Sequence, residues 1–533
     1  MPGGLLTLAA IGAENIFLNG NPSKTFFKAK YNKYTNFGMQ RFRIDYVGNR
    51  EVNFTRETEY TFIIPRYADM LHDTYFVIEL PDIWSTIYYP DPKNKTNSNN
   101  YDEDGNFLGG AYEFKWIENM GTEIIKQVSI YGGGQVLAQY SGEFLNCLKE
   151  RDFSSSKKEL WDRMTGNISE LNSPAVNDIY PSCIFKEGKR IEPSIRGRKL
   201  YIPIEAWFSV NNKCALPLVA IQYTEISIKI TLRPVREWYI IRDVQEFPYF
   251  PYISPIPTKD YQNIKRFINP PQKTPEDYSG KKETWAADIH LISNYIFLDI
   301  EEQHWFSKTE HKYLVKQIFE YDYLNIVENV SVQLNSRDLV SDYMWRFRRN
   351  DASQRNEWAN YTNWPYKNKP FGPSYNEDTP LNFPVFSKYH PENKKEIMKN
   401  MSLVLDGDYR EVQFDSGLYN YVEKWLRCKT NPKDYLYTYC FCLDSNFREY
   451  QPSGAQNMSM FKTIQLKFEI LQPPFDASGV NLQFLCDDVT GEIIGMKKNN
   501  EELYQYTYDL RIFESRYNII TIVSGRIGLL YAR

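Results

Sequence analysis

Several segments of the chain alternate apolar and polar residues with a period of two, which is the pattern of a half-buried β-strand. In residues 226–232 aliphatic side chains occupy every second position, and residues 464–470 repeat the pattern. A third alternating segment covers residues 504–512. Strands with one apolar and one polar face are what packed antiparallel sheets require. The pattern therefore predicts an all-β fold, and two similar strands about one domain length apart suggest an internal duplication.

Helices are predicted at only two places. One helix follows Ser156, with Glu159 three residues later as a capping box, and ends at Gly166. A second, short helix is predicted over residues 392–399.

The length of 533 residues predicts about two large domains. Residues 250–282 are rich in Pro, Tyr and Lys and lack periodicity, so we expect the connection between the domains there. The predicted division is an N-terminal arm (1–35), a first sandwich (36–255), a linker (256–285) and a second sandwich (286–533). Two polar insertions, residues 91–110 and 350–391, are predicted to form long surface loops.

The amino-acid composition supports the all-β prediction and argues against one class of binding partner. Aromatic residues make up 16% of the chain, with 29 Pro and 27 Gly, a mixture typical of strands joined by turns. The 63 Lys and Arg nearly balance the 67 Asp and Glu, so we expect no direct binding to nucleic acid through phosphate neutralisation.

The cysteines and the N-terminus indicate where the chain is made. The seven cysteines are odd in number and form no CxxC pair, so buried free thiols and a reducing compartment are expected. The apolar stretch Leu5–Ala13 is too short for a bilayer, which needs roughly 20 residues. These features predict a soluble protein made in the cytosol.

The sequence contains one candidate cluster of metal-binding or acid–base residues. The triplet 132–134 is glycine throughout, but strand-like segments flank it, so it predicts a hairpin turn rather than a phosphate loop. Two histidines and four carboxylates lie close together and allow either a metal or acid–base site or a solvated strand-to-turn region. We favour the second interpretation, because the histidine spacing fits no common metal motif. The cluster consists of Asp299, Glu301, Glu302, His304, Glu310 and His311.

No catalytic residue, cofactor or metal is therefore expected. Among the Asn-X-Ser/Thr sequons, only Asn94 and Asn360 lie in the two predicted insertions. These two asparagines are the glycosylation candidates, since only exposed loops of a glycosylated protein are modified.

Short motifs spread over almost the whole chain carry a family resemblance. The most specific is the run QPSGAQNMS at residues 451–459, which closely follows a QPSGxxNxS signature. The signature residues are Pro65, Arg66, Asp69, Trp116, Gly133, Gly134, Pro217, Asp299, Pro452, Ser453, Gly454, Asn457 and Ser459. In this order and spacing they resemble the double jelly-roll major capsid proteins of nucleocytoplasmic large DNA viruses.

The resemblance implies a structural subunit and not an enzyme. Each chain would hold two tandem eight-stranded jelly-roll β-sandwiches, with the strand and turn in residues 295–314 opening the second. Three chains would form a homotrimeric capsomer with a pseudo-sixfold outline, located in the virion shell and synthesised in the host cytoplasm. Implied partners are neighbouring capsomers and the minor capsid and penton proteins. The Leu5–Ala13 arm is a candidate anchor to neighbours or to an internal viral membrane.

Two other classes remain open at this stage. In a carbohydrate-binding or carbohydrate-active sandwich, Trp358, Tyr361, Trp364 and Tyr366 would stack on sugars and a carboxylate pair would hydrolyse them. Nothing in the sequence ties two carboxylates together for that purpose. A minor or penton-like shell component usually has a single jelly roll, whereas this chain is long enough for two.

Overall fold

The computed structural model describes most of the chain. The described residues are 2–48, 51–85, 112–176, 179–181, 183, 192–243, 252–259, 262–270, 281–364, 394–473, 482–486, 493–498 and 506–531. The predicted insertion at 91–110, which contains Asn94, lies outside the described residues, as does the insertion at 350–391 beyond residue 364.

The first half of the chain folds into two four-stranded antiparallel sheets with a short addition. One sheet has the order β1 (Phe37–Asp45), β11 (His290–Leu298), β3 (Met70–Glu79), β7 (Lys199–Pro203), and β8 (Leu216–Pro217) pairs with β3. The other sheet has the order β2 (Thr58–Ile63), β9 (Ile226–Leu232), β5 (Ile125–Gly132), β6 (Gln135–Tyr140). Strands β4 (Tyr112–Trp116) and β10 (Tyr239–Asp243) form a separate pair.

The second half repeats this arrangement. One sheet has the order β12 (His311–Ile326), β22 (Tyr508–Val523), β14 (Leu339–Arg349), β17 (Tyr437–Cys440), with additions from β18 (Gln456–Asn457) and β23 (Arg526–Leu529). The other has the order β13 (Val330–Gln333), β19 (Ile464–Ile470), β15 (Met398–Leu405), β16 (Asp408–Asp415). Strands β20 (Leu482–Cys486) and β21 (Ile493–Lys498) pair with each other.

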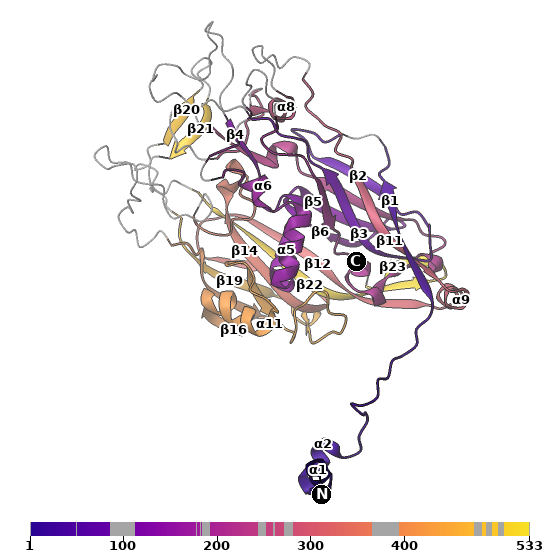
Figure 1. Cartoon of the computed structure of the whole chain (residues 1–533). Helices are drawn as coiled ribbons and strands as arrows, with labels where there is room; N and C mark the ends of the chain where they lie inside the picture. Colours follow the sequence, from indigo (N-terminus) through magenta and orange to yellow (C-terminus); the bar gives the residue numbers. More distant parts are fainter. Residues whose placement is uncertain are drawn as a thin grey trace.

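The two halves have the same strand order. If the eight main strands of each half are numbered along the chain, both halves contain one sheet ordered 1-8-3-6 and one ordered 2-7-4-5. This is the jelly-roll arrangement, and Figure 1 shows the two sandwiches side by side. The prediction of an all-β chain with two tandem eight-stranded jelly rolls is confirmed. We call strands of equal rank in the two halves counterparts.

The predicted strands at 226–232 and 464–470 are β9 and β19, and their burial alternates strictly along both. Their apolar side chains face the cores, with Ile228 and Leu466 fully buried. The third predicted strand is observed from Tyr508 onward as the start of β22. Alternation thus predicts central strands well, because each has a core on one face only.

Of the two predicted helices, one is present and the other is not. Helix α5 (Ser155–Thr165) is present and ends at Gly166, whose φ of 83° suits glycine. Its cap is Ser154 rather than Ser156, and Glu159 pairs with Arg163 at 2.6 Å instead of closing a capping box. The helix predicted over 392–399 is wrong, because described residues 394–397 are not helical and β15 begins at Met398.

The remaining helices are mostly short. They are α1 (Gly3–Ala9), α2 (Ile16–Asn19), α3 (Met120–Glu123), α4 (Gly142–Asp152), α6 (Ser169–Asn172), α7 (Trp207–Val210), α8 (Ile264–Ile268), α9 (Ile300–Lys308) and α11 (Glu423–Arg427), with the π-helical turn η7 (Leu418–Val422) before α11. None of the helices in the described part of the chain is long and apolar enough to cross a membrane.

The pairing of β11 corrects the predicted limits of the two halves. β11 pairs with β1 from Phe37↔Leu298 to Asp45↔His290 and also with β3. It therefore closes the first sandwich instead of opening the second, so the limit lies near residue 299 rather than 286. Phe267, inside the predicted linker, packs on Phe114 with ring centroids 5.0 Å apart. A local pattern reveals a strand but not its distant partner, which is why the limit was misplaced.

Residues 2–36 form an arm that precedes β1. The arm contains no strand, and its apolar side chains are exposed. Figure 1 shows it leaving the body of the molecule, with α1 and α2 at its far end.

Candidate functional site: the seam between the two jelly rolls

Helix α4 carries charged residues of the first half into contact with the second. The hydroxyl of Ser141 caps its start by accepting a hydrogen bond from the backbone N–H of Phe144 at 3.2 Å. Glu143 in the first turn and Arg151 in the last turn complement the helix dipole. Nearly every residue of α4 is buried, because the helix lies between the two halves.

Glu143 is the centre of the first ion-pair cluster. Its carboxylate accepts two hydrogen bonds from the guanidinium of Arg346 on β14, and Arg511 on β22 donates a third at 2.7 Å. Burial alone would raise the pKa of Glu143, but attraction to Arg346, Arg348 and Arg511 outweighs it and holds the pKa well below its usual range. Glu143 is therefore a carboxylate at neutral pH and joins the first half to two strands of the second.

A second buried cluster surrounds Arg151. Its guanidinium donates to Asp342 on β14 and to Asp152 at 2.7 Å, and all three side chains are essentially inaccessible to solvent. The hydroxyls of Ser341 and Ser515 also donate to Asp342. Burial would raise the pKa of Asp342, yet attraction to Arg151 and Lys316 and the hydrogen bond from Ser341 lower it.

Further contacts line the seam at its strand edges. The side-chain amide of Gln317 on β12 donates to the carbonyl oxygen of Leu137 on β6 at 2.7 Å. The backbone N–H of Ser141 donates to Glu320 at the same distance. Arg448 forms a bidentate pair with Glu205, with N–O distances of 2.8 and 3.0 Å. The edge strand β6 of the first half thus lies against the edge strand β12 of the second.

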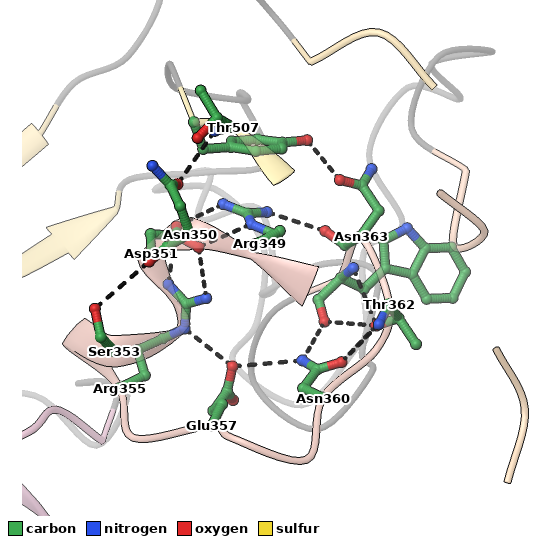
Figure 2. Close-up of polar contacts among 12 residues, drawn as sticks. Arg349, Asn350, Asp351, Ser353, Arg355, Glu357, Asn360, Thr362, Asn363 and Thr507 are labelled. Atoms are coloured by element: carbon green, nitrogen blue, oxygen red, sulfur yellow. Dashed lines mark hydrogen bonds and ion pairs between the residues drawn. The ribbon is translucent and has the colours of Figure 1, made fainter. Parts of the chain in front are cut away.

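A polar cluster in residues 349–364 forms another part of the seam (Figure 2). Asp351 lies between Arg349 and Arg355 and accepts hydrogen bonds from both, at 2.8–3.0 Å. Burial would raise the pKa of Asp351, but the two arginines lower it strongly. Glu357 accepts a further hydrogen bond from Arg355 at 3.0 Å. The cluster holds this segment in one conformation.

The same segment docks onto the first half. The amide of Asn356 donates to the carbonyl oxygens of Arg236 and Tyr239, each at 2.9 Å. The indole N–H of Trp358 donates to the carbonyl oxygen of Glu237 at 3.3 Å, and the guanidinium of Arg233 lies 4.4 Å from the centre of its ring.

The seam is built for rigidity rather than for reaction. The carboxylates of Glu143, Asp342 and Asp351 are paired with arginines, and buried pairs of this kind contribute little net stability because desolvation offsets the attraction. Misalignment of the two jelly rolls is costly, however, since it would leave a buried charge without its partner. The clusters therefore fix one orientation of the two jelly rolls.

The seam residues are those that the sequence analysis missed. A charged helix flanked by polar residues has the composition of a solvent-exposed helix, so nothing marks Glu143 or Arg151 as buried. A repeated Ser-Gly dipeptide would have marked the region of α4 in the sequence. Ser141-Gly142 directly follows β6, and Ser416-Gly417 directly follows its counterpart β16.

The signature residues near residue 455 shape turns. The hydroxyl of Ser453, which follows Pro452, accepts from the backbone N–H of Asp444 at 2.9 Å. Gly454 has φ +140°, and an added Cβ would meet a backbone carbonyl oxygen at 3.0 Å. Asn457 caps a single 3-10 turn, and Ser459 accepts from the backbone N–H of Asp338 at 2.8 Å.

The other signature residues also serve architecture. Gly133 and Gly134 have positive φ in the β5–β6 turn, which confirms the predicted hairpin. Asp69 accepts from the backbone N–H of Leu298 at 2.9 Å, and Asp299 caps α9. The hydroxyl of Tyr295 donates to the carbonyl oxygen of Pro65 at 2.8 Å, and Arg66 donates to the carbonyl oxygen of Thr224 at 3.2 Å. Trp116 packs against Phe114 with ring centroids 5.0 Å apart. Pro217 lies opposite Met70 in the β8–β3 pair.

The structure does not gather the Glu/His cluster into a site. The segment is mainly helix α9, not the strand-to-turn region that we favoured. His304 is exposed, whereas His311 is buried with its Nε2 2.7 Å from the carbonyl oxygen of Phe306. Across the described ranges no three His, Cys, Asp or Glu side chains are placed to hold a metal ion.

The structure also bears on the aromatic residues that would stack on sugars and on the glycosylation sequons. Trp358 and Tyr361 are buried, so neither offers a face for stacking on a sugar, and Tyr366 lies outside the described residues. The side-chain amide of Asn360 donates to the carbonyl oxygen of Trp364 at 2.8 Å and its oxygen accepts from Thr362 (Figure 2). An acceptor amide engaged in this way is a poor glycosylation site.

Comparison with known proteins gives a consistent result over nearly the whole chain. Two family descriptions match: "Major capsid protein N-terminus" over residues 25–299 and "Large eukaryotic DNA virus major capsid protein" over residues 302–528. The first description ends within one residue of the Leu298 end of β11.

Individual relatives are distant. Capsid protein 1 of Acanthamoeba polyphaga mimivirus is 27% identical over 60% of this chain, which spans 44% of that protein's length. The major capsid protein of Pyramimonas orientalis virus is 23% identical over 100% of both chains. The PBCV-1 virus capsid structure superposes with a TM-score of 0.60 at 19% identity, covering 96% of this chain and 100% of that one, which shows a shared fold.

Proposed function

The chain belongs to the major capsid proteins of large eukaryotic DNA viruses, and from this we propose that it trimerises into pseudo-hexameric capsomers that tile an icosahedral shell. The observation that carries the proposal is the repeated strand order of the two jelly rolls within one chain. A hexagonal lattice needs six similar walls around each position. Three copies of a tandem duplication supply them, and closed cyclic symmetry makes such a ring finite.

Partners and location belong to the same proposal. The capsomers would contact one another and the minor capsid and penton proteins, and no direct contact with nucleic acid is proposed. The protein would be synthesised in the host cytoplasm before it enters the shell. The six cysteines whose side chains the structure describes are free thiols, which fits a reducing compartment.

The N-terminal arm is the proposed anchor to neighbours or an internal membrane. Leu8, Phe17 and Leu18 are largely exposed at its far end, although apolar side chains of this size favour burial. Deletion of residues 2–20 is expected to leave the jelly rolls folded and to weaken attachment of capsomers to a lipid vesicle or to the shell. Unchanged attachment would contradict an anchoring role.

Native mass in solution tests the central claim. Three chains of 63.0 kDa give 189 kDa, and light scattering on the purified protein should find this mass and retain it on dilution. A stable species of 63.0 kDa would overturn the capsomer proposal.

A further inference from the structure

A buried amine lies against a buried carboxamide where η7 and α11 follow strand β16 (Figure 1). Asn420 on η7 is 1% exposed and Lys424 on α11 is 4% exposed. The amine of Lys424 donates to the amide oxygen of Asn420 at 2.6 Å and to the carbonyl oxygen of Lys433 at 2.9 Å. Side chains four residues apart on a helix are neighbours, so the backbone itself holds the two groups together.

The amide of Asn420 is polarised on one side and unpartnered on the other. The backbone N–H of Tyr435 also donates to its oxygen, at 3.0 Å. Two donors on one atom fix the orientation of the amide, since the reverse orientation would turn its NH2 group against both donors. In this orientation the amide nitrogen is buried and finds no acceptor among the described residues. Such an unpaired buried donor is unfavourable.

The environment of Lys424 differs from that of Lys149, which stands at the same distance after the Ser-Gly dipeptide of the first half. Burial would lower the pKa of Lys149, but attraction to Glu150 and Asp162 outweighs it and raises the pKa. Lys424 donates instead to two uncharged oxygens, and burial lowers its pKa to about 8. The titratable groups that face it and modify this shift are Asp434, Cys428, Glu150 and Lys158. Lys424 thus has a neutral, nucleophilic amine in a large fraction of molecules near pH 8.

We propose that Lys424 and Asn420 join in an intramolecular isopeptide bond. A nitrogen 2.6 Å from the amide oxygen is about 3–4 Å from the carbon bonded to it, close to the separation of a near-attack conformer. The neutral Nζ of Lys424 attacks Cγ of Asn420, and the bond from Cγ to Nδ2 breaks. One proton passes from the attacking nitrogen to the departing one, so the products are a secondary amide and ammonia.

The hydrogen bonds to Asn420 assist this step. The donors on its oxygen stabilise the negative charge that develops there when Cγ is attacked. The exchange of one amide for another needs no oxidant and no cofactor. It takes place once in each chain, so it is a self-modification and not an enzymatic activity.

The product removes both unfavourable features of the site. Its single amide N–H can donate to the carbonyl oxygen of Lys433, and its oxygen keeps the hydrogen bond from Tyr435. The unpartnered NH2 group leaves as ammonia, and no charge remains on Lys424. A buried charge and a buried unpaired donor are both costly, so their removal favours the crosslink. The bond also closes a ring across a helix of five residues, which is too short to be stable alone.

Intact mass spectrometry of the full chain, held at pH 8, tests the proposal. The chain should be lighter than its sequence mass by one ammonia, about 17 Da. A succinimide at an asparagine would give the same loss, and peptide mapping distinguishes the two. With the crosslink, trypsin should not cut after Lys424, and tandem spectra should show no separation between residues 420 and 424. A chain of full sequence mass, or normal cleavage after Lys424, would overturn the proposal.

Two substitutions identify the amine. Lys424→Arg keeps the positive charge but has no primary amine, so this variant should show the full sequence mass. Lys158→Arg is the matched control, because it changes a lysine that faces the same site, and it should still lose ammonia. Loss of ammonia from Lys424→Arg, or its absence in a folded Lys158→Arg chain, would assign the chemistry elsewhere. The unmodified chain decides the main point even if a variant does not fold.

Discussion

Loss of the Glu143 charge should strongly destabilise the internal seam, although the substitution is conservative in size. Glu143→Gln keeps the size of the side chain but removes the charge that neutralises Arg346, whose side chain is only 2% exposed. Breaking a buried pair by removing one partner costs about 3–5 kcal/mol, because the other charge stays buried. With a urea m-value of ~3 kcal/mol per molar, the unfolding midpoint should fall by about 1 M or more.

Urea unfolding followed by tryptophan fluorescence measures this shift. The matched control is Glu159→Gln, which removes an exposed pair with Arg163 and should change stability by less than about 0.5 kcal/mol. The pKa of Glu143 is held below its usual range, so its contribution is present at neutral pH and lost as pH falls below about 4. Equal midpoints for the two variants at pH 7 would refute the reasoning.

Three further predictions follow from single sites. Burial and repulsion from Glu143 raise the pKa of Glu123, so Glu123→Gln should stabilise the protein at pH 8, and urea titration should find no gain below about pH 4. Gly454→Ala should cost about 1–3 kcal/mol more than Gly407→Ala, since both positions have positive φ but only Gly454 has backbone at 3.0 Å from the added Cβ. After expression in a glycosylating host, peptide mass spectrometry should find Asn360 unmodified, and a glycan there would contradict its packed conformation.

The sequence predicted what depends on local pattern. Strands β9 and β19 alternate strictly because a single core lies on one face of each, so their composition reveals their place. The signature near residue 455 was recognisable because its turns demand particular residues, above all Gly454 at positive φ.

What depends on distant partners could not be predicted. Arg151 and Asp342 are 191 residues apart in sequence, and neither carries a local sign that it is buried. Both sides of helix α4 are covered, so its charged residues are buried. Their number is nevertheless typical of a solvent-exposed helix, and the sequence alone therefore misplaces them. The half to which β11 belongs is set by pairing with β1, which no local pattern encodes.

The late position of β11 has a consequence for synthesis. β1 ends at Asp45, but its partner is complete only when Leu298 has been made, and at ~5–20 residues per second this takes roughly 13–50 s. During that interval β1 and β3 expose unpaired backbone edges that can pair with other nascent chains. A protein made in many copies at once would therefore depend on holding chaperones at the ribosome. A fragment ending at residue 285 should aggregate, whereas one ending at 299 has every strand of its first sandwich.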